Sequence, residues 1–458
     1  MTFKQRLAGW LPITLLATAC AWFTLWLFWP GYMSWDSADQ WRQALSGDFN
    51  DIAPPVMGLI WRQIDRLIPG PGGMLLLQVL LWWGCIAFAV YMTQIGRPRR
   101  ATLLLLAIGF WPALWAVLPH IWKDVWMALA FTGALLLLLQ ESRHPSRGLR
   151  AGSILLLAIG CAFRHNAILG TLPILWWIAT RELSGLAARP RPSRRLALLQ
   201  RPLLTAALAL AVMLAAGLPT RLAGAQRIHD QWAVVSIWDM AAISLHEEQM
   251  LVPSALINRP FTLDELRGKF TAYSNTTIFG TGMFRNPFFG ELTTDERRAV
   301  YSGWLGLAWD HPGAYLAHRG RLSALLFGLD PAGLPDSLVL SPRLVHLEGN
   351  PALQPERPRL QRRVQDWLNA RIDGPFFAGW IYALAALALA ILGWRQRDRH
   401  AHDGLASVAA TSGLLYALPL CVLSGSAEFR YLFWMILSVG LAALLAFSSP
   451  ATREADSN

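Results

Sequence analysis

The chain has 458 residues, of which 54% are hydrophobic and 15% are charged, and its formal net charge is +11. So apolar a composition excludes an ordinary water-soluble protein. Several uncharged runs reach the roughly 20 residues that a helix needs to cross a hydrocarbon layer. We therefore expect an all-α polytopic membrane protein.

Uncharged apolar runs recur along the whole sequence. Each is expected to form a helix, because unpaired backbone groups are costly in lipid. The runs 151–163 and 167–180 are short for a span, so they predict either two short helices that meet at residues 164–166 or one broken span. The predicted fold is a bundle of about ten transmembrane helices, at 11–30, 74–95, 102–119, 125–140, 151–163, 167–180, 202–220, 376–394, 405–427 and 431–449.

The positive charge is concentrated in connectors that fall on one side of this bundle. The N-terminus, the connectors near 97–100, 143–150, 181–201 and 395–399, and the tail carry 18 basic and 6 acidic residues. Basic residues favour cytoplasmic loops, so both termini are expected in the cytoplasm of a bacterial inner membrane. Because topology accounts for the excess charge, no nucleic-acid partner is expected.

Three regions follow from this topology. Residues 1–220 are predicted to form an N-terminal transmembrane module with a first periplasmic loop at 31–73, and residues 376–458 hold the C-terminal transmembrane helices and a short cytoplasmic tail. Residues 221–375 contain 16 basic and 16 acidic residues, as a solvated periplasmic domain would. Capping-box patterns at 262–265 and 293–296 predict that this domain is mainly helical.

Candidate functional residues lie at the outer ends of spans that are far apart in the sequence. Ionisable residues beside spans are expensive and usually functional, although interfacial anchoring explains any one of them alone. Four groups at one level favour a shared site. These groups are Asp36 with Asp39, Lys123 with Asp124, Arg164 with His165, and Glu428 with Arg430.

Such a site would combine carboxylates and cations beside an apolar wall. Arginine and lysine recognise phosphate or diphosphate through charge and donor geometry. One carboxylate could accept a proton from an attacking hydroxyl. The combination is typical of sugar transfer from a polyprenyl-phosphate donor.

The chain resembles the GT-C-type integral-membrane glycosyltransferases, which include protein O-mannosyltransferases and the aminoarabinose transferase of lipid A. The resemblance covers mainly the first 180 residues and the last span. Where many members have glutamate this chain has Ser37, and where many have histidine it has Ala53. The matching features are Asp36 after the first span, the segment 51–59, Lys123-Asp124 at the start of a span, the segment 163–167, and the segment 428–431.

The resemblance implies a GT-C-like helical bundle in which Asp36 is the catalytic base and the donor is a lipid-linked sugar. On this interpretation Asp36 activates an acceptor hydroxyl, which attacks and inverts the anomeric carbon. Lys123, Arg164 and Arg430 would hold the phosphate, and Glu428 would orient Arg430.

The remaining candidates have more modest expected roles. Trp35 would stack on a sugar, and His165 would either contact substrate or pack through a hydrogen bond. The others are assigned to shaping the site: Asp39 to capping or solubilising the loop, Asp124 to neutralising Lys123, and Pro54 and Pro55 to the course of the loop.

Two other functions stay open. A glycan ligase or polymerase acting on diphosphate-linked glycans would rely on arginine or histidine and not on an early aspartate. A flippase or transporter would place charges near the bilayer midplane. The use of a divalent metal is also open. Expected partners are the polyprenyl-phosphate-linked donor, a glycan, lipid or protein acceptor, and membrane lipids.

Overall fold

The structure of the chain is a computed structural model that describes residues 3–94, 97–185, 194–228, 230–287, 290–397 and 401–448. Within these ranges the regular elements are helices, as predicted, and strand pairing is limited to isolated bridges. Each predicted apolar run falls on one helix or on two short consecutive helices. Parts of the basic connectors, at 186–193 and 398–400, and the tail after residue 448 lie outside the described residues.

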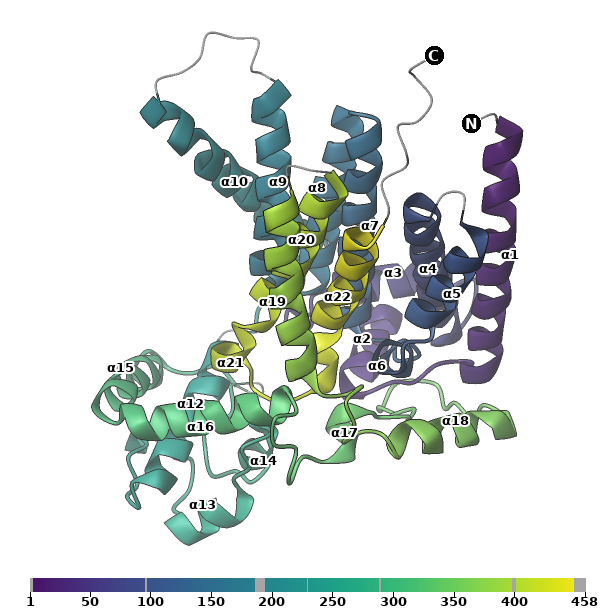
Figure 1. Cartoon of the computed structure of the whole chain (residues 1–458). Helices are drawn as coiled ribbons and strands as arrows, with labels where there is room; N and C mark the ends of the chain where they lie inside the picture. Colours follow the sequence, from purple (N-terminus) through teal and green to yellow (C-terminus); the bar gives the residue numbers. More distant parts are fainter. Residues whose placement is uncertain are drawn as a thin grey trace.

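The helices of the bundle run alternately up and down (Figure 1). Six segments of the described residues are long and apolar enough to cross a membrane, namely Trp10–Phe28, Gly72–Thr93, Lys123–Arg143, Leu199–Leu222, Gly404–Leu423 and Phe429–Ala446. The predicted count of about ten is not confirmed. The bundle consists of α1 (Phe3–Phe28), α4 (Gly72–Thr93), α5 (Pro98–Gly109), α6 (Pro112–Val117), α7 (Lys123–Arg143), α8 (Arg147–Phe163), α9 (Ile168–Gly185), α10 (Arg194–Ala216), α19 (Gly379–Gln396), α20 (Ala401–Ala417), α21 (Leu420–Leu423) and α22 (Phe433–Ala446).

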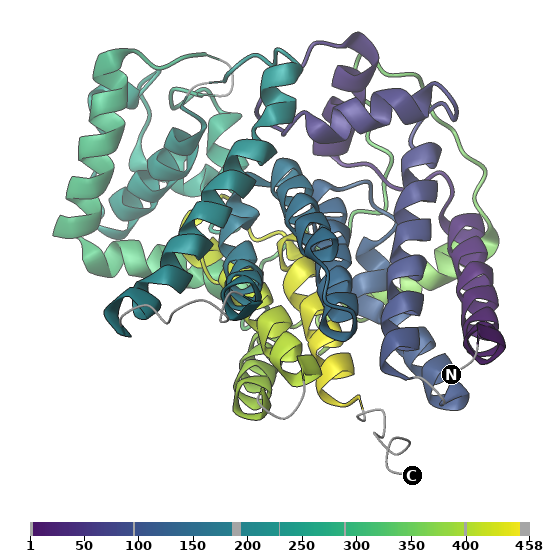
Figure 2. The same cartoon turned by 90° about the horizontal axis from the view of Figure 1, so that it is seen from above.

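The first and last transmembrane regions form one bundle. Helix α20 packs against α9, and α22 packs against α7 and α4, so the C-terminal helices lie beside the N-terminal ones (Figure 2). A small residue permits one of the closest approaches, because a Cβ at Gly413 of α20 would lie 2.0 Å from Ser438 Oγ of α22. This packing brings the start of α22 to the start of α7.

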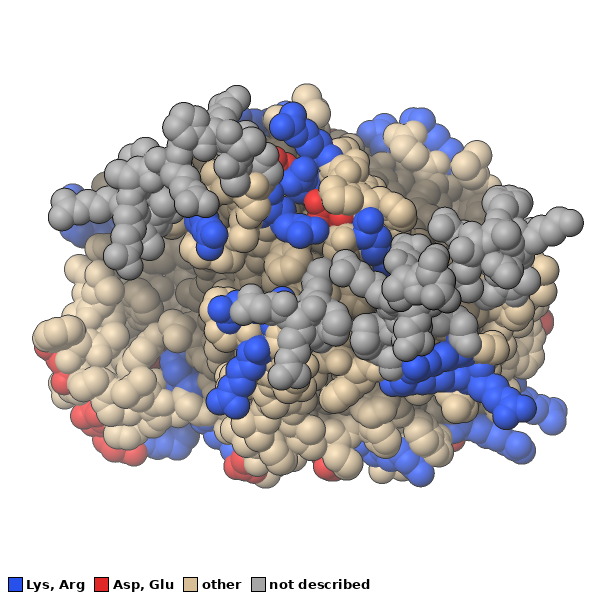
Figure 3. All heavy atoms as spheres, turned by 45° about the horizontal axis from the view of Figure 1, so that its top comes forward, with Lys and Arg blue, Asp and Glu red and all other residues tan. Residues whose placement is uncertain are grey.

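The end of the bundle that holds the termini carries many basic side chains. The start of α1 and the end of α22 lie at the same end, opposite the helical lobe described below (Figure 1). Figure 3 brings that end forward and shows many basic side chains on it. Some of them are paired there, since Glu141 lies 3.3 Å from Arg181 and Glu182 lies 3.1 Å from Arg150.

Residues 231–326 form a helical lobe beyond the opposite end of the bundle (Figure 1). Helix α15 begins with the predicted capping box, in which Thr293 Oγ1 accepts a bond from the Glu296 amide and the Glu296 carboxylate accepts one from the Thr293 amide. Pro312 occupies the first turn of α16. The lobe consists of α12 (Gln231–His246), α13 (Leu263–Lys269), α14 (Thr276–Phe279), α15 (Thr294–Asp310) and α16 (Pro312–Leu326).

An extended segment, residues 341–350, crosses beneath the bundle, and we call it the strap. It leads from α17 (Asp336–Val339) toward α18 (Arg359–Asn369), which lies near α1. The Met33 amide donates to Arg343 O at 2.8 Å, and the Val345 amide donates to Met33 O at 3.1 Å. Asn350 Nδ2 donates to Ala38 O at 2.8 Å. The strap therefore fixes the loop that follows α1.

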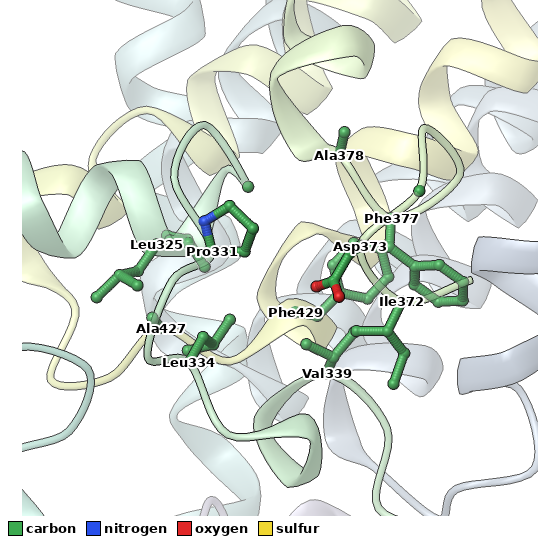
Figure 4. A pocket seen from close by; sticks show the side chains of 13 residues that line it. Leu325, Pro331, Leu334, Val339, Ile372, Asp373, Phe377, Ala378, Ala427 and Phe429 are labelled. Carbon is green, nitrogen blue, oxygen red and sulfur yellow. The ribbon is translucent and has the colours of Figure 1, made fainter. Parts of the chain in front are cut away.

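The lobe, α17 and the start of α19 meet around a small cavity of about 30 Å³ (Figure 4). Its lining is mostly apolar and includes Phe377 and Phe429, whose ring centroids are 5.2 Å apart. Phe429 immediately precedes Arg430. This junction therefore supports the backbone at the start of α22.

Candidate active site

Asp36 lies in the first turn of α2 (Trp35–Ser46), the short helix that follows α1. The backbone before it pairs with the segment that enters α7, since the Tyr32 amide donates to Pro119 O at 2.9 Å and the Ile121 amide donates to Tyr32 O at 2.9 Å. Ser37 Oγ also donates to Ile121 O at 2.7 Å. Ser37 thus ties α2 to the entrance of α7.

Arg430 is the centre of the charged cluster. Its Nη2 donates to Asp36 Oδ2 at 2.6 Å, and its Nε lies 2.5 Å from Glu428 Oε2 and 4.0 Å from Asp124 Oδ2. The contact with Glu428 is the one expected from the sequence. The Arg430 guanidinium therefore joins the neighbouring Glu428 to carboxylates from two distant segments.

Arg164 is the second cation of the cluster. Helix α8 ends at Phe163, and a single 3₁₀ turn, His165–Ala167, leads into α9, so the predicted break falls at this residue. Arg164 Nη1 is paired with Asp124 Oδ1, and its Cζ lies 4.3 Å from the centre of the Tyr431 ring. Asp124 is fully buried and binds Arg164, so its part is larger than the expected neutralisation of Lys123.

Lys123 is the third cation, at the start of α7. It interacts electrostatically with Asp36 and Arg164. Among the residues that the structure describes, it has no hydrogen-bond or ion-pair partner within reach. Arg430 Nη1 is likewise buried without a hydrogen-bond partner. The cluster thus retains donors that an anionic group could use.

Asp36 is the most exposed carboxylate of the cluster. Its side chain is 42% exposed, whereas those of Arg430 and Asp124 are 5% and 0% exposed. Burial by surrounding chain acts to raise the pKa of Asp36, but the nearby charges of Arg430 and Lys123 outweigh it and lower the pKa to about 2. The carboxylate is therefore ionised at neutral pH.

His165 and Trp35 lie at the edge of this cluster. Both side chains are exposed, with Trp35 at 65%. Partial burial and the charge of Lys123 lower the pKa of His165, so it is neutral near pH 7. Both are available to a bound molecule.

Three other predicted residues lie away from the charged cluster. Asp39 pairs with Arg42 at 2.5 Å and accepts a bond from Gln43 Nε2 at 2.6 Å, so it stabilises α2 itself. Pro54 and Pro55 are buried, and Pro55 precedes α3 (Val56–Asp65). Their expected role in shaping the loop stays a prediction.

Sequence reasoning missed aromatic residues that support the cations. Tyr431 lies beside both guanidinium groups, with the Arg430 Cζ 5.4 Å from its ring centre, and its hydroxyl donates to Glu428 Oε1 at 3.0 Å. Trp122 lies 4.9 Å from the Arg430 Cζ and stacks on His120 with centroids 4.1 Å apart. The sequence signal that could have found them is position: Trp122 directly precedes Lys123, and Tyr431 directly follows Arg430.

His120 is the second ring of the stack with Trp122. Burial lowers its pKa to about 4, so the ring is neutral near pH 7. Its Nε2 lies 3.0 Å from Ser341 O of the strap. The Trp122 indole, in turn, donates to Ser34 Oγ at 2.9 Å. The strap, the entrance of α7 and the start of α2 are thus connected.

The lobe reaches the cluster through residues 424–428. Arg319 Nη1 of α16 donates to Ser424 O at 2.8 Å. The Ser424 hydroxyl donates to Ser426 O at 2.6 Å, and the Ser426 hydroxyl donates to Glu428 Oε1 at 3.1 Å. The position of Glu428 therefore depends on a helix of the lobe. Within the described residues, no group of three His, Cys, Asp or Glu side chains is arranged to hold a metal ion.

Comparisons with known proteins give two similar solved structures, both of ArnT from Cupriavidus metallidurans. The apo-state structure is 15% identical over 96% of this chain and 77% of that chain, with a TM-score of 0.30. The structure bound to undecaprenyl phosphate is 15% identical over 94% of this chain and 76% of that chain, with a TM-score of 0.32. No family model and no curated protein matches the sequence.

Proposed function

We propose that the chain is an inverting membrane glycosyltransferase, which moves a sugar from a polyprenyl-phosphate donor to a hydroxyl of a glycan, lipid or protein. The charged cluster lies at the end of the bundle opposite the basic connectors, which supports a position on the periplasmic side of a bacterial inner membrane. The GT-C-like motifs in the sequence support the same activity.

The observation that carries the proposal is the bond between Arg430 and the exposed Asp36. The same guanidinium has a buried nitrogen, Nη1, without a partner. A phosphate bound there would lie next to the carboxylate. It would also offset the positive charge that holds the pKa of Asp36 low, which makes the carboxylate a stronger base when the donor is bound.

The reaction follows from these positions. The acceptor oxygen bonds to the anomeric carbon while the bond from that carbon to the phosphate oxygen breaks, and the Asp36 carboxylate receives the hydroxyl proton. The phosphate leaves with the electron pair of the broken bond. Its additional negative charge is stabilised by Arg430 and Lys123. Asp36 then returns the proton to water.

Asp36→Asn is expected to lower sugar transfer about 100-fold or more, because an amide cannot accept the proton. The measurement is transfer of labelled sugar from membranes to acceptor, with folding checked by thermal unfolding of the purified chain. Asp39→Asn is the matched control, since it removes a carboxylate from the same helix outside the cluster. Substantial activity in folded Asp36→Asn would refute the assignment. If Asp36→Asn is tolerated and activity is lost on substitution of Arg164 or His165, a glycan ligase is favoured.

The pH dependence gives an independent test. Because the pKa of Asp36 is lowered to about 2, its carboxylate stays ionised until the pH falls well below the ordinary range for aspartate. We expect kcat/KM, which reports the free enzyme, to show no acid limb from Asp36 between about pH 5 and 7. Lys123→Gln removes one of the lowering charges, so any acid limb should move to higher pH. An acid limb near neutral pH that vanishes in the residual activity of Asp36→Asn would contradict this prediction.

A further inference from the structure

A second, larger cavity lies on another side of α22, along the transmembrane part of the bundle. It has a volume of about 450 Å³ and is lined mainly by apolar side chains of α5, α6, α19 and α22, and we call it the α22 groove. Its lining runs along α22 from Ile436 to Leu444 and includes Phe447 just after the helix, so the groove reaches the end of α22 farthest from Arg430. The groove is in the size range of small-molecule sites.

One end of the groove contains polar groups without partners. Gln94, which follows α4, is only 4% exposed, and both its amide nitrogen and its amide oxygen lack a hydrogen-bond partner. Leaving a buried amide unpaired is costly. Arg100 of α5 lines the same end, where its Nη2 donates to Phe447 O at 2.9 Å. This end therefore suits a ligand with hydrogen-bonding and anionic groups.

At the opposite end of the groove, the polar side chains already have hydrogen-bond partners. Trp111 Nε1 donates to the Tyr382 hydroxyl at 2.7 Å, and that hydroxyl donates to Phe376 O at 2.8 Å. No corresponding bonds are made by Gln94. The groove is thus polarised, with its unmet polar groups at the end that carries the basic connectors.

We propose that the α22 groove binds an anionic phospholipid of the leaflet at the Arg100 end. The phosphate headgroup would contact Arg100 and the Gln94 amide, and an acyl chain would extend toward Trp111. The unpaired polar groups lie at the Arg100 end of the groove, which suits a lipid whose headgroup is at that end. The tail of the sugar donor fits less well, because the phosphate of the donor would lie at the Arg430 end. This site is separate from the proposed catalytic one.

The test measures lipid binding by the purified full-length chain with native mass spectrometry and thermal shift, using phosphatidylglycerol, phosphatidylethanolamine and a polyprenyl phosphate. Arg100→Gln is expected to weaken phosphatidylglycerol binding about tenfold, since a charge-assisted hydrogen bond is lost. Gly440→Leu should displace the lipid by filling the groove. A Cβ there meets only Ile108 Cγ2, at 3.9 Å.

Arg99→Gln is the matched control, because Arg99 is exposed on the same helix and does not line the groove. Phosphatidylglycerol binding that is lost in Arg100→Gln and Gly440→Leu and kept in Arg99→Gln supports the proposal. Equal binding in all variants would overturn it. So would loss of polyprenyl-phosphate binding in Gly440→Leu with phosphatidylglycerol binding unchanged. None of these outcomes depends on glycosyl transfer.

Discussion

Arg430→Gln is expected to lower glycosyl transfer about 1,000-fold or more and to destabilise the start of α22. The substitution removes the charge that contacts Asp36 and Glu428, and leaves those carboxylates without their shared cation. Loss of one preorganised donor already costs about 100- to 1,000-fold in rate. Here the base, the phosphate site and the loop at 424–428 are affected together.

Arg430→Lys separates charge from geometry. Lysine retains the positive charge but has a single ammonium group. The planar guanidinium of arginine reaches two carboxylates and still has Nη1 available for the phosphate, which an ammonium cannot do. We expect a stable variant with activity reduced by at least about tenfold, and with most of the loss in donor KM. Full activity in Arg430→Lys would show that charge alone suffices. Full activity in Arg430→Gln would rule out the site.

Asp239→Asn is expected to cost the lobe about 3–5 kcal/mol of unfolding free energy, because it leaves Arg319 buried without a counter-charge. Asp239 is fully buried, and its Oδ2 accepts bonds from Arg319 Nη2 at 2.6 Å and from Trp304 Nε1 at 2.9 Å. Differential scanning fluorimetry of the purified protein and denaturant unfolding would measure the loss.

A double variant tests whether this pair also positions the site. Asp239→Leu combined with Arg319→Met should recover most of the stability, since apolar residues often replace a buried ion pair without loss. It cannot restore the Arg319 bond to Ser424 O. We therefore expect recovered stability with reduced kcat. Recovery of both would mean that the lobe does not position Glu428.

The convergence of the charged residues could be predicted from the sequence. Alternating spans determine which loops share a side, and the structure brings Asp36, Arg164 and Arg430 to the same end of the bundle. The helical character of the lobe and the start of α15 were also predictable, because capping boxes are local patterns.

The pairing within the cluster could not be predicted in the same way. Adjacent residues of a helix point about 100° apart, so Lys123 and Asp124 face different neighbours. Which cation Asp124 binds depends on the rotation of α7 and α8 about their axes, and a linear sequence does not contain that rotation. Hydrophobic periodicity could not predict the strap either, since the bonds of the strap to Met33 join irregular backbone segments.

The bond between Asp36 and Arg430 has a consequence for how the protein is made. The two residues are separated by 394 positions in the chain, so the ribosome completes α2 long before Arg430 exists. The strap, which holds the loop before α2, is also translated late. An incomplete chain in the membrane would therefore lack both the partner and the support of Asp36. Under the proposed function, catalytic competence would arise only after Arg430 has been translated.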